Sequence, residues 1–402
     1  MYNIKLADYV PEPNPATTDR IVAAHYYAAW KKGAPGLHEG FDDLHDYPER
    51  TPLMGYYDEE DPKVTDWEIK WALEHGINCF IYCWYRKLDN MGKPVTVNDL
   101  RCGHGLHEAL FNAKYQKLMK FAIMFENCDR WGTTDSEDIV EHLMPFWAEN
   151  YFKRENYLVL DNKPVLFIYN QPRLAGVFKD PAEQKAAFDA CREYAKKAGF
   201  DGMYFGLCDP TPDKKMFDES MARGYDFRFG YNAGYEADVD MPDEDEVIDA
   251  QCEILKGRLS IDPMRHLATA SCFSDVAPRC TDRWAERGYE FFRDYKTWYL
   301  LPENFRRLLR RMKEMTDALP DGAWGKRIFM IDNWNEWDEG HFVAPSHGFG
   351  FKYLQAIREE FTERDNLPDY RTPQDMGLVN YNSSWETPDF TGVSDKRPFT
   401  TD

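Results

Sequence analysis

The sequence predicts a (β/α)8 TIM barrel, and three observations support this prediction. Eight short apolar segments recur along the chain, amphipathic helical patterns lie between them, and several apolar segments end in polar or aromatic residues. Near-continuous apolar runs are typical of strands covered on both faces, and eight such strands alternating with eight helices is the repeat of this barrel. A doubly wound open sheet is the alternative, but the sequence lacks the glycine-rich phosphate turn expected after an early strand of that fold.

The expected elements follow one another along the chain in a regular order. The expected strands are residues 21–30, 77–86, 120–127, 164–170, 202–208, 225–232, 266–274 and 327–334. The expected helices are residues 62–75, 104–119, 136–152, 181–198, 213–223, 243–260, 303–318 and 348–361. Asp61-Pro62 and Asp180-Pro181 each supply a helix cap followed by a proline at the first helical position. Gly76 and Gly199 follow two of these helices as stop signals.

Residues 20–364 are expected to form a single catalytic barrel, since barrels often reach the length of this chain as one domain. Residues 1–19 are polar and rich in proline, which predicts an N-terminal arm on the surface. Residues 365–402 show no clear periodicity and predict an irregular C-terminal tail that wraps the barrel or faces a partner. Long loops are expected after strands 1 and 7, and loops of such length are uncommon unless they have a function.

Composition argues against several classes of partner. The formal net charge is −21 and there is no basic cluster, which argues against binding nucleic acid or an anionic membrane surface. Nine cysteines without CxxC spacing are typical of reduced core residues in a cytoplasmic protein. The first 20 residues lack the basic and apolar regions of a signal peptide, so a cytoplasmic location is expected unless a leader has been trimmed. The oligomeric state is left open.

The expected strand ends are rich in aromatic residues, amides and acids. A barrel of this kind carries its chemistry at the carboxyl ends of the strands. The residues expected there include His25, Tyr27, Trp84, Tyr85, Glu126, Asn127, Asn170, Asp209, Tyr231, Asn232, Asp275 and Arg279. Aromatic rings stack on the apolar faces of sugars, while carboxylates and amides bind the hydroxyl groups, so this composition predicts a carbohydrate cleft.

The last expected strand ends in the densest group of such residues. Residues 327–340 read Arg-Ile-Phe-Met-Ile-Asp-Asn-Trp-Asn-Glu-Trp-Asp-Glu-Gly, so a core strand leads into a short turn with four acids, two amides and two tryptophans. A solvated strand end has no need of two tryptophans beside carboxylates. The combination instead suits the binding and cleavage of a sugar.

Three short patterns are weak candidates for metal sites. His38 and His45, with the acids around them, match no standard ligand spacing, and His104-x-x-His107 lies near an expected helix start. Residues 238–240 imitate the Asp-x-Asp of metal-dependent glycosyltransferases but lie in an acidic stretch typical of a solvated helix start. We therefore expect neither a metal nor another cofactor.

Residues 334–340 (Trp-Asn-Glu-Trp-Asp-Glu-Gly) resemble the signature of the family 99 glycoside hydrolases and of the related WbsX-like domain family. Residues 55–58, 72–85 and 275–279 resemble further blocks of the WbsX-like pattern, as does Phe125-Glu126-Asn127 together with Trp131. The resemblance covers about residues 20–362. Family 99 comprises retaining endo-acting α-mannosidases and α-mannanases on a (β/α)8 barrel, whereas WbsX-like proteins are often labelled glycosyltransferases of surface polysaccharide synthesis.

The resemblance implies a role for each of two glutamates. Glu336 matches the family carboxylate that acts as a general base on the sugar's own 2-hydroxyl, giving a 1,2-anhydro sugar intermediate. Glu339 matches the general acid that protonates the leaving oxygen. The sequence departs from the patterns at Asp338, where family 99 often has histidine, and at Ser274, where the WbsX-like pattern tends to have tryptophan.

We therefore expect a retaining glycoside hydrolase that acts on an α-linked oligosaccharide or polysaccharide fragment of a mannose-type or related sugar. Glu336 and Glu339 are the expected catalytic residues. The expected substrate-binding residues are His25, Tyr27, Trp84, Glu126, Asn127, Arg279, Asn333 and Trp334. One alternative is a glycosyltransferase of surface polysaccharide synthesis, which would have to hold a nucleotide diphosphate. The other is a non-catalytic carbohydrate-binding barrel.

Overall fold

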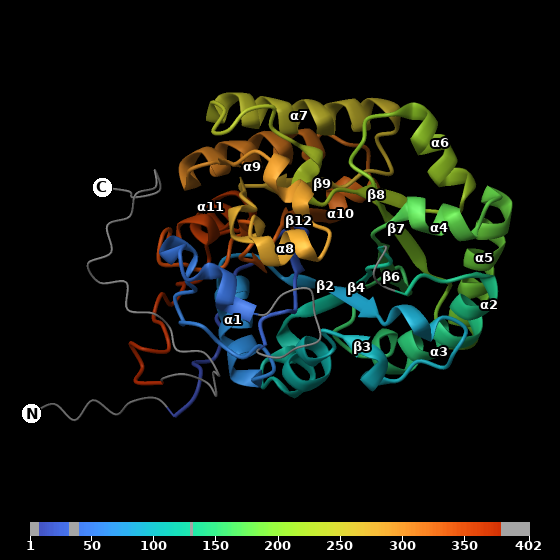
Figure 1. Ribbon diagram of the computed structural model, residues 1–402, viewed down its shortest axis with the longest axis horizontal. Helices are drawn as coiled ribbons and strands as arrows, with labels where there is room; N and C mark the ends of the chain where they lie inside the picture. The colour runs from blue at the N-terminus through green and yellow to red at the C-terminus, as the bar shows by residue number, and fades with distance from the viewer. Residues whose placement is uncertain (1–7, 32–39, 129–131, 379–402) are drawn as a thin grey trace, which may run out of the picture.

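A computed structural model describes residues 8–31, 40–128 and 132–378 of the chain (Figure 1). Eight parallel strands form its centre, in the order β8-β7-β6-β4-β2-β1-β12-β9. Their bounds are β1 Ile21–Tyr26, β2 Cys79–Arg86, β4 Lys120–Phe125, β6 Lys163–Ile168, β7 Tyr204–Cys208, β8 Phe227–Phe229, β9 Ala268–Ser271 and β12 Ile328–Asp332. Each of these strands coincides with one of the eight expected segments, with small differences at the ends.

The sheet curls into a nearly closed barrel. β1 pairs with β2 on one side and with β12 on the other, so the first and last strands are neighbours. Between β8 and β9 the contact is a single parallel bridge from Arg228 to His266, where the Leu267 N–H donates to the Arg228 carbonyl at 2.9 Å. The prediction of a (β/α)8 barrel is confirmed.

Helices lie around the outside of the strands (Figure 1). The larger ones are α1 Pro62–Glu74, α5 Pro181–Lys197, α6 Lys214–Ala222, α7 Glu244–Ile261, α9 Pro302–Asp317 and α11 Lys352–Phe361. Shorter helices are α2 Ser136–Asp138, α3 Met144–Trp147, α4 Gln171–Val177, α8 Asp282–Glu286 and α10 Trp324–Arg327. The expected caps are present, since the Asp61 side chain accepts from the Lys63 N–H and that of Asp180 from the Ala182 N–H. Within the described part of the chain, none of the helices combines the length and apolar character that a membrane span requires.

The segment predicted as a helix over residues 104–119 is broken into short turns. It contains a π-helical turn at Gly105–Ala109 and 3₁₀ turns at Leu110–Asn112 and Gln116–Leu118. Side chains bond to backbone groups that a regular helix would pair. The Asn112 amide donates to the His107 and Glu108 carbonyls at 2.9 and 2.8 Å, and Asp66 accepts from the N–H groups of residues 114 and 115.

Strand periodicity sorts the side chains of β1 into two layers. His25 points into the barrel, where its ring lies 5.8 Å from that of Phe229 on β8. Tyr26 points outward, and its hydroxyl donates to Glu68 of α1 at 2.7 Å. Successive residues of a strand face opposite sides of the sheet, so only every second residue at a strand end reaches the barrel interior.

The described parts of the two expected arms lie side by side. The backbone of residue 17 donates to Asp365 at 3.0 Å, and the Asn366 amide donates to the Asn14 carbonyl at 2.6 Å. Asn366 also donates to the carbonyl of Glu74 at the end of α1, at 3.1 Å. The remainder of the expected arms, residues 1–7 and 379–402, lies outside the described residues.

Candidate active site

A cavity of about 830 Å³ lies at the carboxyl ends of the barrel strands. The strand ends and the segment after β12 contribute Tyr27, Tyr85, Glu126, Tyr169, Asn170, Tyr231, Glu336, Glu339 and His341 to its lining. The loops after β8 and β9 contribute Tyr235, Glu236, Ser274, Arg279, Tyr289, Phe291, Phe292, Asp294, Tyr295, Lys296 and Trp298. Both the place and the volume are typical of a small-molecule site on this fold, where such pockets measure roughly 300–1,000 Å³.

Glu336 lies on a short hairpin that follows the last barrel strand. β13 Asn335–Glu336 pairs antiparallel with β14 His341–Phe342, and this pairing fixes the direction of the Glu336 side chain. The Asn333 amide donates to Glu336 Oε2 at 3.1 Å, and the Tyr231 hydroxyl donates to the same oxygen. Arg279 Nη2 lies 3.2 Å from Oε1. These three donors fix the position of the carboxylate at the edge of the cavity.

Arg279 is buried among three carboxylates. It forms two hydrogen bonds of 3.0 Å to Asp338, in addition to its contact with Glu336 and an ion pair with Glu339. Burial opposes the charge on the guanidinium, but Asp338 and Glu336 raise the pKa of Arg279 above its usual value. The positive charge of Arg279 is therefore neutralised by protein carboxylates. The guanidinium holds Glu336 and Glu339 in one site.

Glu126 lines the same cavity at the end of β4. Its side chain is buried, and this burial, followed by the neighbouring Glu336, raises the pKa of Glu126 well above its usual value. Glu126 therefore keeps its proton to a higher pH than an exposed glutamate does. A protonated carboxyl in a sugar cleft can donate a hydrogen bond as well as accept one.

A buried ionic group lies beneath the cavity floor. Asp332 Oδ1 is 3.5 Å from His25 Nδ1, and its Oδ2 is 3.3 Å from His341 Nδ1. Burial opposes ionisation, but His341 and His25 hold the pKa of Asp332 well below its usual value. The His25 ring also lies 4.8 Å from that of Tyr231, whose hydroxyl bonds to Glu336. His25 thus supports a residue of the cavity from below.

The structure brings five of the predicted site residues together in the cavity lining: Tyr27, Glu126, Arg279, Glu336 and Glu339. Asn333 is fully buried behind them and reaches Glu336 with its amide. Asn127 is also buried, and it exchanges hydrogen bonds of 2.8 and 2.9 Å with the backbone of Asn170. Asn127 therefore joins the ends of β4 and β6, and its amide is used by the protein itself.

Two predicted tryptophans lie away from the cavity, in the layer between the barrel and its helices. Trp84 Nε1 donates to the Tyr151 hydroxyl at 2.9 Å, and Trp334 Nε1 donates to Glu68 of α1 at 3.1 Å. Trp337 is likewise buried, with its Nε1 bonded to the Tyr57 hydroxyl at 3.2 Å. The tryptophans of residues 334–337 hold the turn that carries Glu336 and are not platforms for a sugar. Trp131 lies outside the described residues.

Several cavity residues were not singled out from the sequence, among them His341, Glu236, Tyr289, Phe291 and Phe292. His341 comes into the site because Gly340 turns the chain with a φ of 75°. A Cβ at Gly340 would meet the Asp275 backbone N at 2.7 Å, so only glycine fits this turn. The aromatic residues of this set could have been predicted from the run Tyr289-Glu-Phe-Phe, which stands out within a long polar insertion.

The groups of residues that could bind a metal ion are poorly suited to one. Ligand atoms of Glu336, Glu339 and His341 lie within 4.8 Å of one another, but Arg279 already supplies a positive charge to both glutamates. Asp240, from the Asp-x-Asp pattern, accepts from the Thr297 N–H at 3.0 Å. His38 lies outside the described residues.

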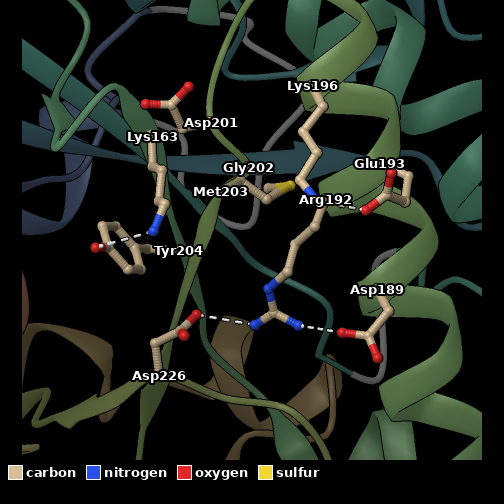
Figure 2. Close-up of a pocket in the computed structure, with 10 residues that line it drawn as sticks. All are labelled: Lys163, Asp189, Arg192, Glu193, Lys196, Asp201, Gly202, Met203, Tyr204 and Asp226. Carbon is tan, nitrogen blue, oxygen red and sulfur yellow. Dashed lines mark hydrogen bonds and ion pairs between the residues drawn. The ribbon is translucent and has the colours of Figure 1, made fainter.

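A second depression, of about 440 Å³, lies at the opposite end of the barrel (Figure 2). It surrounds the starts of β6 and β7, and several of its charged groups form hydrogen bonds within the depression. Arg192 of α5 bonds to Asp189 at 2.8 Å and to Asp226 at 2.9 Å, while Lys163 reaches the Tyr204 hydroxyl at 3.5 Å (Figure 2). The bond from Arg192 to Asp226 joins α5 to the residue before β8, which is the stabilising role usual for this end of the fold.

Residues 129–357, more than half of the chain, match the model of the family described as Glycosyltransferase WbsX. The chain belongs to the WbsX family. Two curated relatives, each described as an uncharacterized protein WxcX of Xanthomonas campestris pv. campestris, are 21% and 20% identical over 381 residues. The match takes in 90% of this chain and 50% of each relative, so the chain spans about half the length of these relatives.

Solved structures of a GH99 endo-alpha-mannosidase from Bacteroides thetaiotaomicron are similar to this WbsX family member. One has a TM-score of 0.56 at 14% sequence identity and covers 87% of this chain and 100% of the enzyme. The other, a complex with bis-tris propane, has a TM-score of 0.55 at 15% identity and covers 85% and 96%. The predicted resemblance to both families is confirmed, and at this identity the structural likeness establishes the fold.

Proposed function

We propose that the protein is a retaining glycoside hydrolase that cleaves an α-linked oligosaccharide or polysaccharide fragment of a mannose-type or related sugar. The observation that carries this proposal is the pairing of Glu336 and Glu339 with one buried arginine in the cavity at the strand ends. Most glycoside hydrolases use two carboxylic acid side chains on either side of the glycosidic bond that they cleave.

Glu336 is proposed as the general base. Its carboxylate accepts hydrogen bonds from Asn333 and Tyr231, which orient it. It takes the proton of the sugar 2-hydroxyl while that oxygen attacks the anomeric carbon. The bond from the anomeric carbon to the leaving oxygen breaks, giving a 1,2-anhydro sugar. Water then attacks the anomeric carbon with net retention, its proton passes to Glu339, and Glu336 returns its proton to the 2-oxygen as the anhydro ring opens.

Glu339 is proposed as the general acid. Its side chain is 19% exposed, compared with 7% for Glu336, so it has readier access to the water that opens the 1,2-anhydro sugar and returns its proton. It donates that proton to the leaving oxygen as the glycosidic bond breaks. Glu126, which keeps its proton to a higher pH than usual and lines the same cavity, is proposed to hydrogen-bond a hydroxyl group of the substrate.

The family description makes a nucleotide-sugar transferase the second candidate. The charges of the cavity favour the hydrolase. A diphosphate is usually bound by helix N-termini, by arginines or through a metal. Here the cavity is lined by five acidic side chains (Glu126, Glu236, Asp294, Glu336 and Glu339), and its cations Arg279 and Lys296 are paired with protein acids.

The proposal is tested by incubating the purified protein with a panel of α-linked oligosaccharides and, separately, with nucleoside diphosphates and manganese. We expect cleavage of at least one oligosaccharide and thermal stabilisation by it, since a ligand at a hundred times its Kd adds about 2.7 kcal/mol. Stabilisation by a nucleoside diphosphate with manganese, without any effect of oligosaccharides, would instead establish the transferase.

We further propose that residues 20–364 are the whole catalytic unit and that residues 1–19 and 365–402 are arms. The hydrogen bonds between residue 17 and Asp365 and between Asn366 and Asn14 support this division, because they join the two arms to each other beside α1.

A further inference from the structure

We propose a second sugar-binding subsite on the loop after β9. Its aromatic platform consists of the exposed rings of Phe291 and Tyr295, which lie 6.1 Å apart at an interplanar angle of 61°, so that either ring can offer its face to a neutral sugar ring. The subsite rests on the proposed function, because its occupant is a further ring of the chain that is cut at Glu336 and Glu339.

The exposure of the two rings is unusual for this chain. Among the described residues, the exposed phenylalanine, tyrosine and tryptophan side chains are Phe291 (43%), Tyr295 (49%) and Tyr370 (44%). Two of these three line the cavity that contains the proposed catalytic glutamates. Exposed apolar groups that gather at one cavity indicate a binding surface, and an aromatic ring offers a flat face to the C–H side of a sugar.

The platform rests on a small apolar cluster of its own. Val276, Trp284 and Phe292 are buried together, apart from the main core of the barrel. The Tyr289 and Phe292 rings stack at 5.5 Å, and the Phe291 ring lies 4.8 Å from that of Phe292. The loop therefore buries Phe292 and leaves Phe291 exposed at the cavity.

Hydrogen bonds at Thr297 fix the end of this loop. The Thr297 hydroxyl donates to Asp275 at 3.1 Å, which joins the end of the loop to its beginning. The backbone of Thr297 bonds to the loop after β8, through Asp240 at 3.0 Å and the Met241 N–H at 2.7 Å. A platform held in this way binds without the entropic cost of ordering a flexible loop.

Polar groups beside the platform favour a neutral ring. Glu236 lines the same cavity as Tyr295. Burial, followed by the negative charge of Glu236, raises the pKa of Tyr295. Asp294 lies in the same lining. These carboxylates can accept hydrogen bonds from sugar hydroxyls but would repel a uronate. The platform is also continuous with the proposed catalytic group, since Arg279 lies over the Phe292 ring at 5.4 Å.

The test measures the binding of α-linked mannooligosaccharides of two to five rings to the full-length chain by titration calorimetry. Glu339→Gln is the common background, so that no chain is cleaved. We expect Phe291→Ala and Tyr295→Ala each to raise the Kd for four- and five-ring chains by about 2- to 10-fold, which is the worth of one aromatic contact. The Kd for the disaccharide should rise less.

Tyr370→Ala is the matched control, because it removes an aromatic ring of similar exposure outside the cavity and should leave every Kd unchanged. Wild-type affinity of Phe291→Ala and Tyr295→Ala for the long chains would overturn the subsite and leave the proposed function intact. An equal rise in Kd at all chain lengths would also overturn it, since that result indicates a disturbed cavity. If the background protein binds no oligosaccharide, the proposed function fails, and the subsite fails with it.

Discussion

Arg279 Nη2 lies 3.2 Å from Glu336 Oε1, while the same guanidinium forms two bonds of 3.0 Å to Asp338. The arginine is thus part of the arrangement that orients the proposed base. The Trp284 and Phe292 rings lie 5.1 and 5.4 Å from its central carbon, which fixes the plane of the guanidinium as well as its position.

Arg279→Lys should therefore lower kcat by about tenfold or more, because a lysine ammonium cannot bind several carboxylates in this fixed planar geometry. The measurement is steady-state kinetics on the best oligosaccharide of the panel. Arg283→Lys is the control, since Arg283 pairs with Asp43 and is not part of the glutamate pair. Unchanged kcat and KM for Arg279→Lys would show that this geometry is not needed.

Glu336→Gln and Glu339→Gln should each lower kcat by roughly 100- to 10,000-fold, the usual worth of general acid or base catalysis. Neither change should lower the melting temperature, because three carboxylates surround one arginine and removing one charge reduces their repulsion. Activated leaving groups need no protonation, so an aryl glycoside or glycosyl fluoride should largely restore the rate of Glu339→Gln alone. Restoration only in Glu336→Gln would reverse the two roles.

The stability of the protein should depend on the ionisation of Glu68. Burial, followed by the neighbouring Glu59, raises the pKa of Glu68 to about 8 from an ordinary value of 4.5. Between these two values the folded state binds the proton more tightly than the unfolded chain does, so the free energy of unfolding should fall as the pH rises from about 5 to 8. The slope from one such group is at most about 1.4 kcal/mol per pH unit.

Glu68→Gln should remove this part of the pH dependence, since glutamine carries no titrating proton. Urea unfolding at pH 5, 6.5 and 8 compares the variant with the wild type, and Glu253→Gln on the surface of α7 is the control. A pH dependence in Glu68→Gln equal to that of the wild type would mean that Glu68 does not titrate in this range.

The cavity should discriminate against acidic sugars. Its lining carries four acidic side chains besides the protonated Glu126, and Arg279 is paired with three protein acids. We expect uronate oligosaccharides to bind at least about tenfold more weakly than neutral ones of equal length, with the difference shrinking at high salt. Calorimetric titration at two salt concentrations measures this, and tighter binding of the uronate would contradict the charge argument.

The sequence was sufficient for the number, order and type of the barrel strands, because each leaves an apolar run of recognisable length. It was also sufficient for Glu336 and Glu339 as the candidate pair, through the resemblance of residues 334–340 to known families. The side of the strand on which a residue falls was harder to predict. A shift of one residue moves a side chain to the other face, and Trp84 and Trp334 are both in the outer layer.

Contacts between segments far apart in the sequence could not be predicted from it. Tyr231 and Asn333 are 102 residues apart, yet both bond to Glu336, and no local sequence pattern indicates such a pair. The aromatic platform of Phe291 and Tyr295 lies at a short 3₁₀ turn, Glu290–Asp294, which the sequence pattern does not predict. The role proposed for this platform depends on which aromatic rings of the loop are buried, and tertiary packing determines that.

The pairing of β1 with β12 sets an order of events during synthesis. About 300 residues separate these two neighbouring strands, so a ribosome adding about 5–20 residues per second needs on the order of 15 to 60 s to deliver the second after the first. During that interval the nascent chain offers one side of β1 as an unpaired edge, which is a template for association with other chains. The chain is therefore most prone to aggregation just before its last strand emerges.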